Sequence, residues 1–391
     1  MAKPEIRLKG FEGEWKTSPL IDLCTINPSS TLPDSFEYVD LESVVGTEMK
    51  SHRKEYKNTA PSRAQRLAKD GDIFYQTVRP YQKNNYLFKD RGEYYVFSTG
   101  YAQLRTDLIP HYLFNILQSD SFVNQVLLNC TGTSYPAINP SNLSRLLVTY
   151  SENRDEQKAI AGYFKSLDSM IQATTKKIAS LNQMKSASLI SMFPQAGETT
   201  PRVRFKGFEE EWLTAELGEL FQERIESNIN GEMLSVTMNS GIIKASENGR
   251  FDNSNSDKSK YKVVKINDIA YNSMRMWQGA SGCSPYEGIV SPAYTVVAPN
   301  EGVDSGFFAY MFKTDALIKL FRLHSQGLTS DTWNLKYPAF SMISVLYPKD
   351  IKEQQRIASY FRSLDKQISL QEQRLEKLKQ IKSACLDKMF V

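Results

Sequence analysis

The chain has 391 residues, 24% of them charged, and a formal net charge of +4. This length predicts two or three domains with cores of their own, and the weakly basic charge permits nucleic-acid binding without arguing for it. Four dispersed cysteines form no CxxC pair, which disfavours structural zinc and fits a reducing cytoplasm. The sequence has no secretory signal and no apolar run of about 18 residues, so we expect a cytoplasmic protein without a membrane span.

Motifs for nucleotide or cofactor chemistry are missing from the sequence. It has no GxxxxGK[ST] phosphate loop, no GxGxxG turn and no Asn-Pro-Pro-aromatic tetrapeptide of an amino-methyltransferase. His52, His111 and His324 have no partner at a spacing useful for catalysis, so we assign them to packing or to the surface. We therefore expect that the chain is not an enzyme by itself. We expect it to have no catalytic residues, no metal ligands and no bound cofactor.

A long internal repeat organises the chain. Residues 7–15, Arg-Leu-Lys-Gly-Phe-Glu-Gly-Glu-Trp, return at 204–212 as Arg-Phe-Lys-Gly-Phe-Glu-Glu-Glu-Trp, and residues 156–168 return at 353–365, both 197 positions later. The segments between these blocks agree much less well. Constant frames around divergent contents suit a scaffold with two different specificities; the alternative is an old duplication with one half idle.

Residues 1–152 are predicted to form a mixed α/β domain, because a β-like run at 94–97 precedes a helix-like stretch at 112–117. Residues 153–193 are predicted to form one long helix, without proline and with apolar residues at heptad spacing. A linker is expected over residues 194–203.

Residues 204–349 repeat the α/β character, with a β-like pair at 289–290 and a helix-like stretch at 307–312, and residues 350–391 repeat the long helix. Each helix needs a cover for its apolar stripe, and a pseudo-twofold repeat sends the second helix back along the first. The predicted fold class is therefore α+β: two mixed α/β domains joined by two long helices that form an antiparallel coiled coil. The alternative is that each helix packs on its own domain.

The seam of this predicted coiled coil is imperfect, because Thr174, Lys185 and Ser188 occupy seam positions. Its apolar members are Ile160, Phe164, Leu167, Ile171, Ile178, Leu181, Ile357, Phe361, Leu364, Ile368, Leu375 and Leu378.

Two stretches are rich in cations. Residues 49–69 carry seven, among them Lys54 and Lys57, against one acid, and the second half has a thinner set in Arg250, Lys258, Lys260, Lys262 and Lys265. Cations at this density suit DNA phosphates, which position a protein without reading sequence. For any single lysine, a solvated loop is the alternative.

Base reading needs donors and acceptors held in fixed geometry, with arginine for guanine and asparagine or glutamine for adenine. Small, polar and aromatic residues of this kind gather near 76–85 and 131–139 in the first half, and near 272–278 and 326–334 in the second. Ordinary turn chemistry is the alternative for each cluster. The candidate base-reading residues are Arg79, Tyr81, Gln82, Lys83, Asn84, Ser134, Tyr135, Asn139, Arg275, Trp277, Gln278, Ser330, Thr332, Trp333 and Asn334.

The whole pattern resembles the DNA specificity subunits (the HsdS family) of type I restriction–modification systems. The resemblance rests on the two Glu-Gln-x-x-Ile-Ala-x-Tyr-Phe-x-Ser-Leu-Asp blocks at 156–168 and 353–365, each between a variable domain and a long helix, and on the Lys-Gly-Phe-x-x-x-Trp motifs at 9–15 and 206–212. Individual base contacts diverge within that family and cannot be carried over.

The resemblance implies that each variable domain is a target-recognition domain for one half of a split, asymmetric, double-stranded DNA target. It implies that the long helices space the half-sites and dock two methyltransferase subunits, which can recruit two ATP-dependent restriction subunits. S-adenosylmethionine, ATP and magnesium are then expected in these partners, which methylate adenine on a flipped base.

Two other functions remain open at this point. The chain could be a stand-alone DNA-binding or nuclease protein with an unrecognised active site, although the missing cofactor motifs speak against it. It could also be a coiled-coil scaffold that only joins proteins, although the two large, different globular segments with basic loops speak against that.

Overall fold

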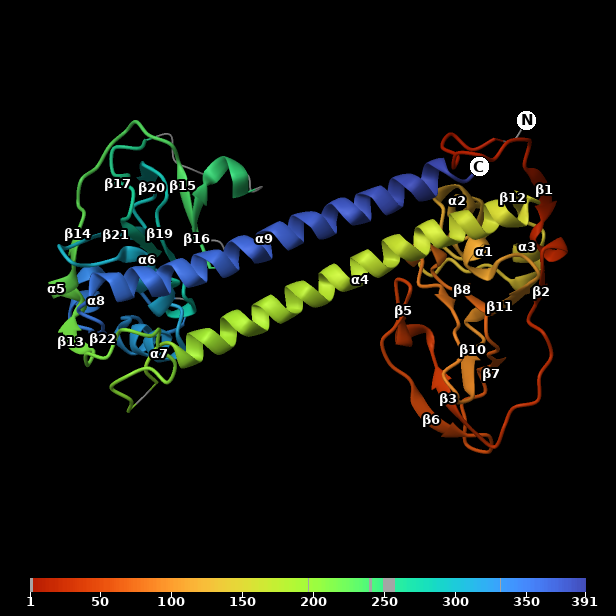
Figure 1. The fold of residues 1–391 in the computed structure, drawn as a ribbon, viewed down its shortest axis with the longest axis horizontal. Coiled ribbons are helices and arrows are strands. Elements are labelled where there is room, and N and C mark those ends of the chain that lie inside the picture. The colour runs from red at the N-terminus through yellow and green to blue at the C-terminus, as the bar shows by residue number, and fades with distance from the viewer. Residues whose placement is uncertain (1–2, 196, 239–240, 249–256, 331) are drawn as a thin grey trace. The chain divides into compact units, whose positions relative to one another are not determined.

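The computed structural model describes residues 3–195, 197–238, 241–248, 257–330 and 332–391 (Figure 1). The chain forms two compact units, and each combines a sheet-rich domain with parts of both long helices. Unit 1 comprises Met1–Lys176 and Gln373–Val391, and unit 2 comprises Lys177–Glu372. No helix in these described ranges is long and apolar enough to cross a membrane.

Unit 1 contains two four-stranded sheets, with strand orders β2-β11-β8-β9 and β6-β3-β10-β7, and the smaller pairs β1-β12 and β4-β5. Its strands are β1 (Lys16–Pro19), β2 (Cys24–Ile26), β3 (Ser35–Val39), β4 (Val44–Val45), β5 (Glu48–Met49), β6 (Arg53–Tyr56), β7 (Ala64–Leu67), β8 (Ile73–Gln76), β9 (Tyr86–Leu87), β10 (Tyr95–Ser98), β11 (Tyr101–Thr106) and β12 (Leu147–Tyr150). Its short helices are η1 (Leu20–Asp22), η2 (Leu41–Ser43), η3 (Pro80–Gln82), α1 (Pro110–Ile116), α2 (Asp120–Leu128) and α3 (Pro140–Ser144).

The two sheets of unit 1 share an aromatic core. Every residue of β8 and β10 is buried, and the rings of Phe74 and Phe97 stack with centroids 3.6 Å apart. On its other side, β8 contributes Ile73 and Tyr75 to a cluster with residues of α1 and α2. A strand buried on both faces needs apolar residues in succession rather than in alternation, and the run Ile-Phe-Tyr in β8 meets this need.

Unit 2 repeats one of these sheets, with strand order β14-β21-β18-β19, and adds the pairs β13-β22, β15-β16 and β17-β20. Its strands are β13 (Leu213–Glu216), β14 (Phe221–Glu223), β15 (Leu234–Thr237), β16 (Gly241–Lys244), β17 (Lys262–Val264), β18 (Ile269–Asn272), β19 (Ser281–Cys283), β20 (Gly288–Val290), β21 (Tyr294–Pro299) and β22 (Ser344–Tyr347). Its short helices are α5 (Leu217–Leu220), η4 (Ala245–Asn248), η5 (Met276–Gln278), α6 (Ser305–Met311), α7 (Asp315–His324) and α8 (Tyr337–Ser341).

The local predictions inside both domains are confirmed. The β-like run at 94–97 falls on β10 and the pair at 289–290 on β20. The helix-like stretches correspond to α1 and α6, which end one residue earlier than the sequence pattern suggested.

The long helices are α4 (Arg154–Ser191) and α9 (Ile351–Lys388), each of 38 residues. Both begin at a capping side chain: Asn153 Oδ1 accepts from the Asp155 amide at 2.9 Å, and Asp350 Oδ1 accepts from the Lys352 amide at 2.8 Å. Such caps satisfy amides that the first turn of a helix leaves without partners.

In unit 1 the start of α4 packs against the end of α9 (Figure 1). Phe164 stacks on Phe390 with ring centroids 5.7 Å apart, and Lys382 Nζ lies 2.5 Å from the Asp168 carboxylate. Residue numbers rise along one helix as they fall along the other, so the two segments are antiparallel, as predicted.

Unit 2 makes the same contacts with the helices exchanged. Phe361 of α9 stacks on Phe193, just beyond the end of α4, at 5.9 Å, and Asp365 accepts from Lys185 Nζ at 2.6 Å. Every residue here is 197 positions from its counterpart in unit 1, so the pseudo-twofold repeat holds at the level of single side chains.

The predicted seam needs a correction, because its first members in each helix do more than pair helices. Ile160, Phe164 and Leu167 belong to the hydrophobic core of the unit 1 domain, and Ile357, Phe361 and Leu364 belong to that of unit 2. Both proposed arrangements therefore occur together: each helix starts in the core of its own domain and is covered there by the end of the other helix.

The remaining seam members differ in burial. Leu181, Ile368 and Leu378 are buried, whereas Ile171, Ile178 and Leu375 are half-buried. The three polar seam residues have hydrogen-bond partners: Lys185 binds Asp365, Ser188 Oγ lies 2.9 Å from Tyr360 Oη, and Thr174 Oγ1 donates to the Met170 carbonyl at 2.7 Å. The seam is thus partly polar, and its polar members are satisfied.

The Lys-Gly-Phe motifs lie against the far end of a long helix in both units. The Ile6 amide donates to the Lys388 carbonyl at 2.9 Å, and the Val203 amide donates to the Ser191 carbonyl at 2.9 Å. The motif tryptophans follow the same pattern, Trp15 against Phe390 and Trp212 against Phe193. In unit 1 this contact joins segments from opposite ends of the sequence, whereas in unit 2 only a short linker separates them.

Candidate nucleic-acid interface

Two candidate clusters of the first half come together in unit 1. The Arg79 amide donates to the Pro136 carbonyl at 2.8 Å, and the Ile138 amide donates to the Thr77 carbonyl at 3.0 Å. The Arg79 guanidinium lies 4.3 Å from the centre of the Tyr135 ring, a distance at which a cation and an aromatic face attract each other. Residues 76–85 and 131–139 therefore form one surface.

The corresponding clusters of the second half meet in the same way in unit 2. The Leu335 amide donates to the Ser273 carbonyl at 2.8 Å. The Trp277 and Trp333 rings meet edge to face at 5.2 Å, and the Arg322 guanidinium lies 5.0 Å from the Trp333 ring. Arg322 of α7 is a member of this surface that the sequence pattern did not indicate, because nothing local connects a helix residue to a distant loop.

Both surfaces expose groups that can approach a ligand. Tyr81 is 50% and Tyr135 63% exposed. Gln82 and Ser134 of unit 1, and Arg275, Gln278, Ser330 and Thr332 of unit 2, are also exposed. Arginine, glutamine and hydroxyl side chains on a rigid frame are the groups that read base edges.

The unit 1 loop is held in an unusual backbone conformation. Arg79 and Lys83 have φ of 55° and 53° without being glycine, a region that most side chains avoid. Asn85 Oδ1 accepts from the Gln76 amide at 2.7 Å, and Gln76 Nε2 donates to Gln82 Oε1 at 3.1 Å. Such strain persists where the surroundings impose it, and it is found at binding sites.

Several candidates are engaged inside the protein. Lys83 Nζ donates to the Gln118 carbonyl at 2.8 Å and lies 2.5 Å from Asp120 Oδ1. Asn84 Oδ1 accepts from the Gly46 amide, and Asn139 Oδ1 caps α3 through the Asn142 amide, both at 2.7 Å.

In unit 2, Thr332 Oγ1 donates to the Thr329 carbonyl at 2.9 Å, and Trp277 Nε1 donates to the Met274 carbonyl at 3.1 Å. Asn334 pairs with Gln326 through two backbone hydrogen bonds. These hydrogen bonds shape the loops, in agreement with the turn-chemistry alternative for part of each cluster.

The cations of the basic stretch at 49–69 fall into two groups, those that are paired or partly buried and those that are exposed without an ion pair to any residue that the structure describes. Lys50 pairs with Glu48, Arg53 pairs with Asp40 and Glu55, and burial lowers the pKa of Arg66. Lys54 on the edge strand β6 and Lys57 just after it are exposed and have no ion pair among the described residues. These two lysines therefore keep their charge available for phosphates.

In the second half, Lys262 pairs with Glu223 at 3.4 Å and Lys265 with Glu226 at 3.2 Å. Lys260 is exposed, and Arg250 lies outside the described residues.

Buried charge pairs position the frames around these loops. Arg7 makes a two-pronged contact with Glu156, at 2.7 and 2.9 Å, and Arg204 makes the same contact with Glu353, at 2.6 and 2.8 Å. The sequence prediction did not pair these residues, although the 197-position repeat of both the arginine and the glutamate was a usable signal.

No metal centre is present in the described part of the chain: no three His, Cys, Asp or Glu side chains gather where they could hold an ion. The histidines have local partners instead, His52 Nδ1 with Glu37 at 2.7 Å, His111 with Asn115, and His324 with the Leu320 carbonyl. Burial lowers the pKa of His111.

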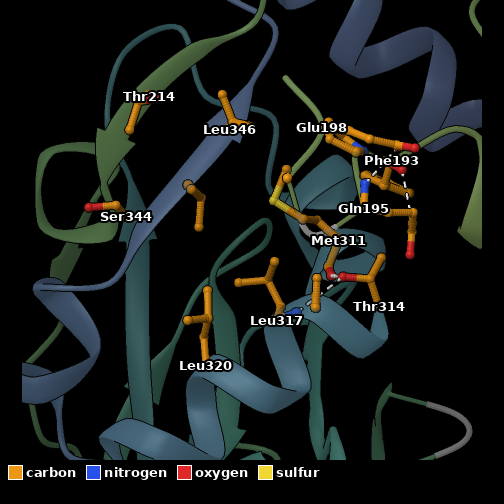
Figure 2. A pocket seen from close by; sticks show the side chains of 14 residues that line it. Phe193, Gln195, Glu198, Thr214, Met311, Thr314, Leu317, Leu320, Ser344 and Leu346 are labelled. Atoms are coloured by element: carbon orange, nitrogen blue, oxygen red, sulfur yellow. Dashed lines mark hydrogen bonds between the residues drawn. The ribbon is translucent and has the colours of Figure 1, made fainter. Parts of the chain in front are cut away.

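A cavity of about 330 Å³ in unit 2 is separate from the recognition loops. Residues 193–195, 197 and 198 surround it together with α6, α7 and β22 (Figure 2), with Met311, Leu317 and Leu346 among its apolar lining. Its one carboxylate, Glu198, is occupied by the Gln195 amide and by Arg202. None of the candidate DNA-contacting residues lines this cavity.

Residues 209–380 match the model of the type I restriction modification DNA specificity domain. This stretch contains the unit 2 recognition surface and most of α9. The second half of the chain is therefore similar to this DNA specificity domain.

One curated relative and two solved structures are similar to this chain. The HindI specificity subunit of Haemophilus influenzae is 29% identical over 140 residues, which span 34% of this chain and 30% of that subunit. The S subunit of a type I system from M. genitalium has a TM-score of 0.62 at 15% identity, with 100% of this chain and 99% of that chain covered.

A chain from a structure of type I system assembly and conformational transition has a TM-score of 0.55 at 19% identity, with 97% and 98% covered. At these identities the two structures show a shared fold over the whole chain.

Proposed function

We propose that this chain is the sequence-reading subunit of a type I restriction–modification complex, in which each sheet-rich domain reads one half of a bipartite, asymmetric DNA target. The observation that carries the proposal is the convergence, in both units, of two distant polar and aromatic segments into one exposed surface with an arginine over an aromatic ring. Exposed Lys54 and Lys57 of unit 1 are available for phosphate contacts.

The chemistry is assigned to partner subunits. In this proposal two methyltransferase subunits bind S-adenosylmethionine, and two restriction subunits bind ATP and magnesium. The long helices of this chain dock the methyltransferases and fix the spacing of the half-sites, and the complex works on DNA in the cytoplasm. The proposal therefore predicts that the pure chain neither methylates nor cleaves DNA when all three cofactors are supplied.

A stand-alone DNA-binding or nuclease protein is the second candidate. A DNA-cleaving site commonly gathers acidic side chains around divalent cations, and the described residues contain no group suited to this. DNA cleavage by a preparation proven free of partner subunits would favour this candidate and contradict the first.

An exchange of recognition domains tests the two-reader proposal. Residues 16–150 are replaced by the corresponding domain of a relative, and the variant is expressed with its methyltransferase. One half of the methylated target should change and the other half should stay, because each domain has its own core and its own surface. Methylome sequencing measures the outcome, and a target altered in both halves would contradict independent readers.

A further inference from the structure

Each recognition surface includes a short helical turn that is tied to the helices behind it by a lysine. In unit 1 the turn is η3, and Lys83, the next residue, reaches the Gln118 carbonyl at 2.8 Å and Asp120 at 2.5 Å. In unit 2 the turn is η5, and the lysine comes from the opposite side: Lys313 Nζ donates to the carbonyls of Gly279 and, at 2.8 Å, Ser281.

The two ends of this contact occupy equivalent positions in the units. Lys83 and Gly279 each follow the helical turn, have positive φ of 53° and 80°, and donate their amide to the first residue of that turn. Gln118 and Lys313 each precede the hydroxyl residue that caps the next helix, Ser119 for α2 and Thr314 for α7. The same lysine–carbonyl contact therefore occurs in both units. The lysine follows the helical turn in unit 1 and precedes the helix cap in unit 2.

We infer that this lysine tether positions the base-reading loop in both domains, and that the tethering lysine has changed sides between them, from Lys83 in the first domain to Lys313 in the second. The inference rests on the proposed function for its consequence, which is specificity. Lys83 and Lys313 are positioning residues, because they hold the loops and are not themselves offered to DNA.

The environment of Lys313 suits such a role. Its ammonium also donates to the Met238 carbonyl at 3.1 Å, so three carbonyls from two segments converge on one donor. Burial and, to a smaller extent, the nearby Lys185 charge lower its pKa to about 8, and Asp365 opposes this. At neutral pH the side chain is thus largely charged, and its hydrogen bonds are charge-assisted.

Unit 2 also has a carboxylate at the position of Asp120, the acidic partner of Lys83 in unit 1. Asp315 begins α7 as Asp120 begins α2, two residues beyond the tether position, and it is exposed. A lysine at position 279 would therefore meet both a main-chain carbonyl and a carboxylate, as Lys83 does. A side chain there would contact Ile318 Cδ1 at 3.2 Å, the movable end of a side chain, and the φ of 80° would add backbone strain of the kind that Lys83 tolerates at 53°.

Hydrogen exchange of the full chain without DNA tests the tether directly. Lys313→Met should speed exchange of the amides at 275–280 by about tenfold or more, because a charge-assisted anchor is lost, and should leave residues 77–85 unchanged. Lys83→Met should do the reverse. Tryptophan emission should shift only in Lys313→Met, because Trp277 lies in η5. Lys319→Met, an exposed lysine of α7, is the matched control.

A transplant provides the rescue. Lys313→Gln combined with Gly279→Lys copies the unit 1 arrangement into unit 2, and it should restore slow exchange and the original emission, whereas Lys313→Gln alone should not. Lys313→Met could also speed exchange in β18 and β21, which would mean that the whole domain is destabilised. In that case the comparison of Lys313→Gln with the double variant shows whether the tether itself protects the amides at 275–280. Unchanged exchange at 275–280 in the single variants, or no rescue, would overturn the inference.

Binding to DNA then tests the consequence. In the chain assembled with its methyltransferase, Lys313→Met should relax selection in the half-site read by unit 2 and leave the other half unchanged, with the opposite result for Lys83→Met. Faster loop exchange with unaltered selection would overturn the positioning role. If the unaltered complex selects no DNA sequence, the proposed function fails, but the exchange and rescue results still decide whether the tether exists.

Discussion

At the scale of single residues, the structure distinguishes exposed side chains that can contact DNA from side chains that already have partners inside the protein. The Arg79 side chain packs on the Tyr135 ring, whereas Lys54 is exposed on the edge strand β6 and Lys57 is exposed just after it. These two classes should contribute differently to DNA binding, because base contacts carry sequence information and phosphate contacts do not.

Arg79→Ala should weaken binding to the specific target by roughly tenfold to a hundredfold and leave non-specific binding almost unchanged, since a bidentate guanine contact is worth about 1–3 kcal/mol. Arg275→Ala should act likewise on the other half-site. Titrations of the assembled complex with target and scrambled DNA measure this.

Lys54→Ala and Lys57→Ala should instead weaken all DNA binding and reduce the slope of log affinity against log salt by about 0.9 for each lost phosphate contact. Lys50→Ala, which removes a lysine already paired with Glu48, is the control. The sorting of residues would be wrong if the arginine and lysine variants behaved alike.

Glu156 shows how a buried charge ties the N-terminal segment to α4. Burial alone would raise the pKa of this carboxyl, but hydrogen bonds from Arg7 and Ser151 outweigh it and lower the pKa. A lowered carboxyl pKa contributes stability above the unfolded pKa of about 4.3, and this stability is lost as the pH falls through the folded value.

Glu156→Gln should therefore lower the free energy of unfolding by about 2–4 kcal/mol at neutral pH, because the Arg7 charge loses its buried partner. The deficit should shrink as the pH falls below the unfolded value of about 4.3 and through the lowered folded value, because the wild-type carboxyl then becomes protonated as well. Chemical unfolding at pH 7 and pH 3 measures both values, and an equal deficit at both would contradict the ion-pair explanation.

At the scale of elements, capping side chains decide where helices begin. Asn153 and Asp350 start the long helices, and Asn139 starts α3 beside the unit 1 surface. Asn139 was a candidate base reader, but its side-chain oxygen is used in the cap.

Asn139→Ala should cost about 1 kcal/mol of stability through the lost cap and change the selected DNA sequence little. Asn139→Ser keeps a capping oxygen and should be nearly neutral. Thermal unfolding and DNA selection are measured on both variants. Loss of selection in a stable Asn139→Ser protein would show that this residue reads a base after all.

The long helices are matched by specific contacts rather than by a uniform apolar stripe. The pairs Lys382–Asp168 and Lys185–Asp365 and the stacked phenylalanines recur in the same register in both units. Contacts of this kind fix the register of two helices more strictly than apolar residues alone.

At the scale of the whole molecule, the proposed spacing role can be tested through helix length. Four alanines inserted between Thr174 and Lys177 lengthen α4 by about 6 Å and rotate the remainder of the helix by about 40° beyond one turn. A base pair rises about 3.4 Å, so the preferred spacer should grow by about one or two pairs, with unchanged half-sites and lower affinity.

Selection of bound DNA from a library with randomised spacers, by the complex assembled with methyltransferase, measures this change. The same insertion in α9, between Gln371 and Arg374, is the matched comparison, because these positions correspond through the repeat. An unchanged spacer in a folded variant would rule out the helices as the element that sets the distance.

The amino-acid sequence by itself determined the repeat, the two long helices with their antiparallel pairing, and the resemblance to a family. These features depend on local periodicity and on identical residues at a constant offset, and both can be read along the chain. The charge pairs Arg7–Glu156 and Arg204–Glu353 lay within the same repeat, and they could have been found there.

Only the tertiary structure decided which polar residues form each recognition surface and which of them are free to act. Arg79 meets Tyr135, and Lys313 meets Gly279, across segments that are far apart in sequence and whose contents differ between the two halves. A sequence does not show whether a given lysine is exposed to solvent or bound to a carbonyl, or whether a given asparagine is exposed or bound to an amide. That distinction depends on which chain segments pack together, and local sequence patterns do not encode it.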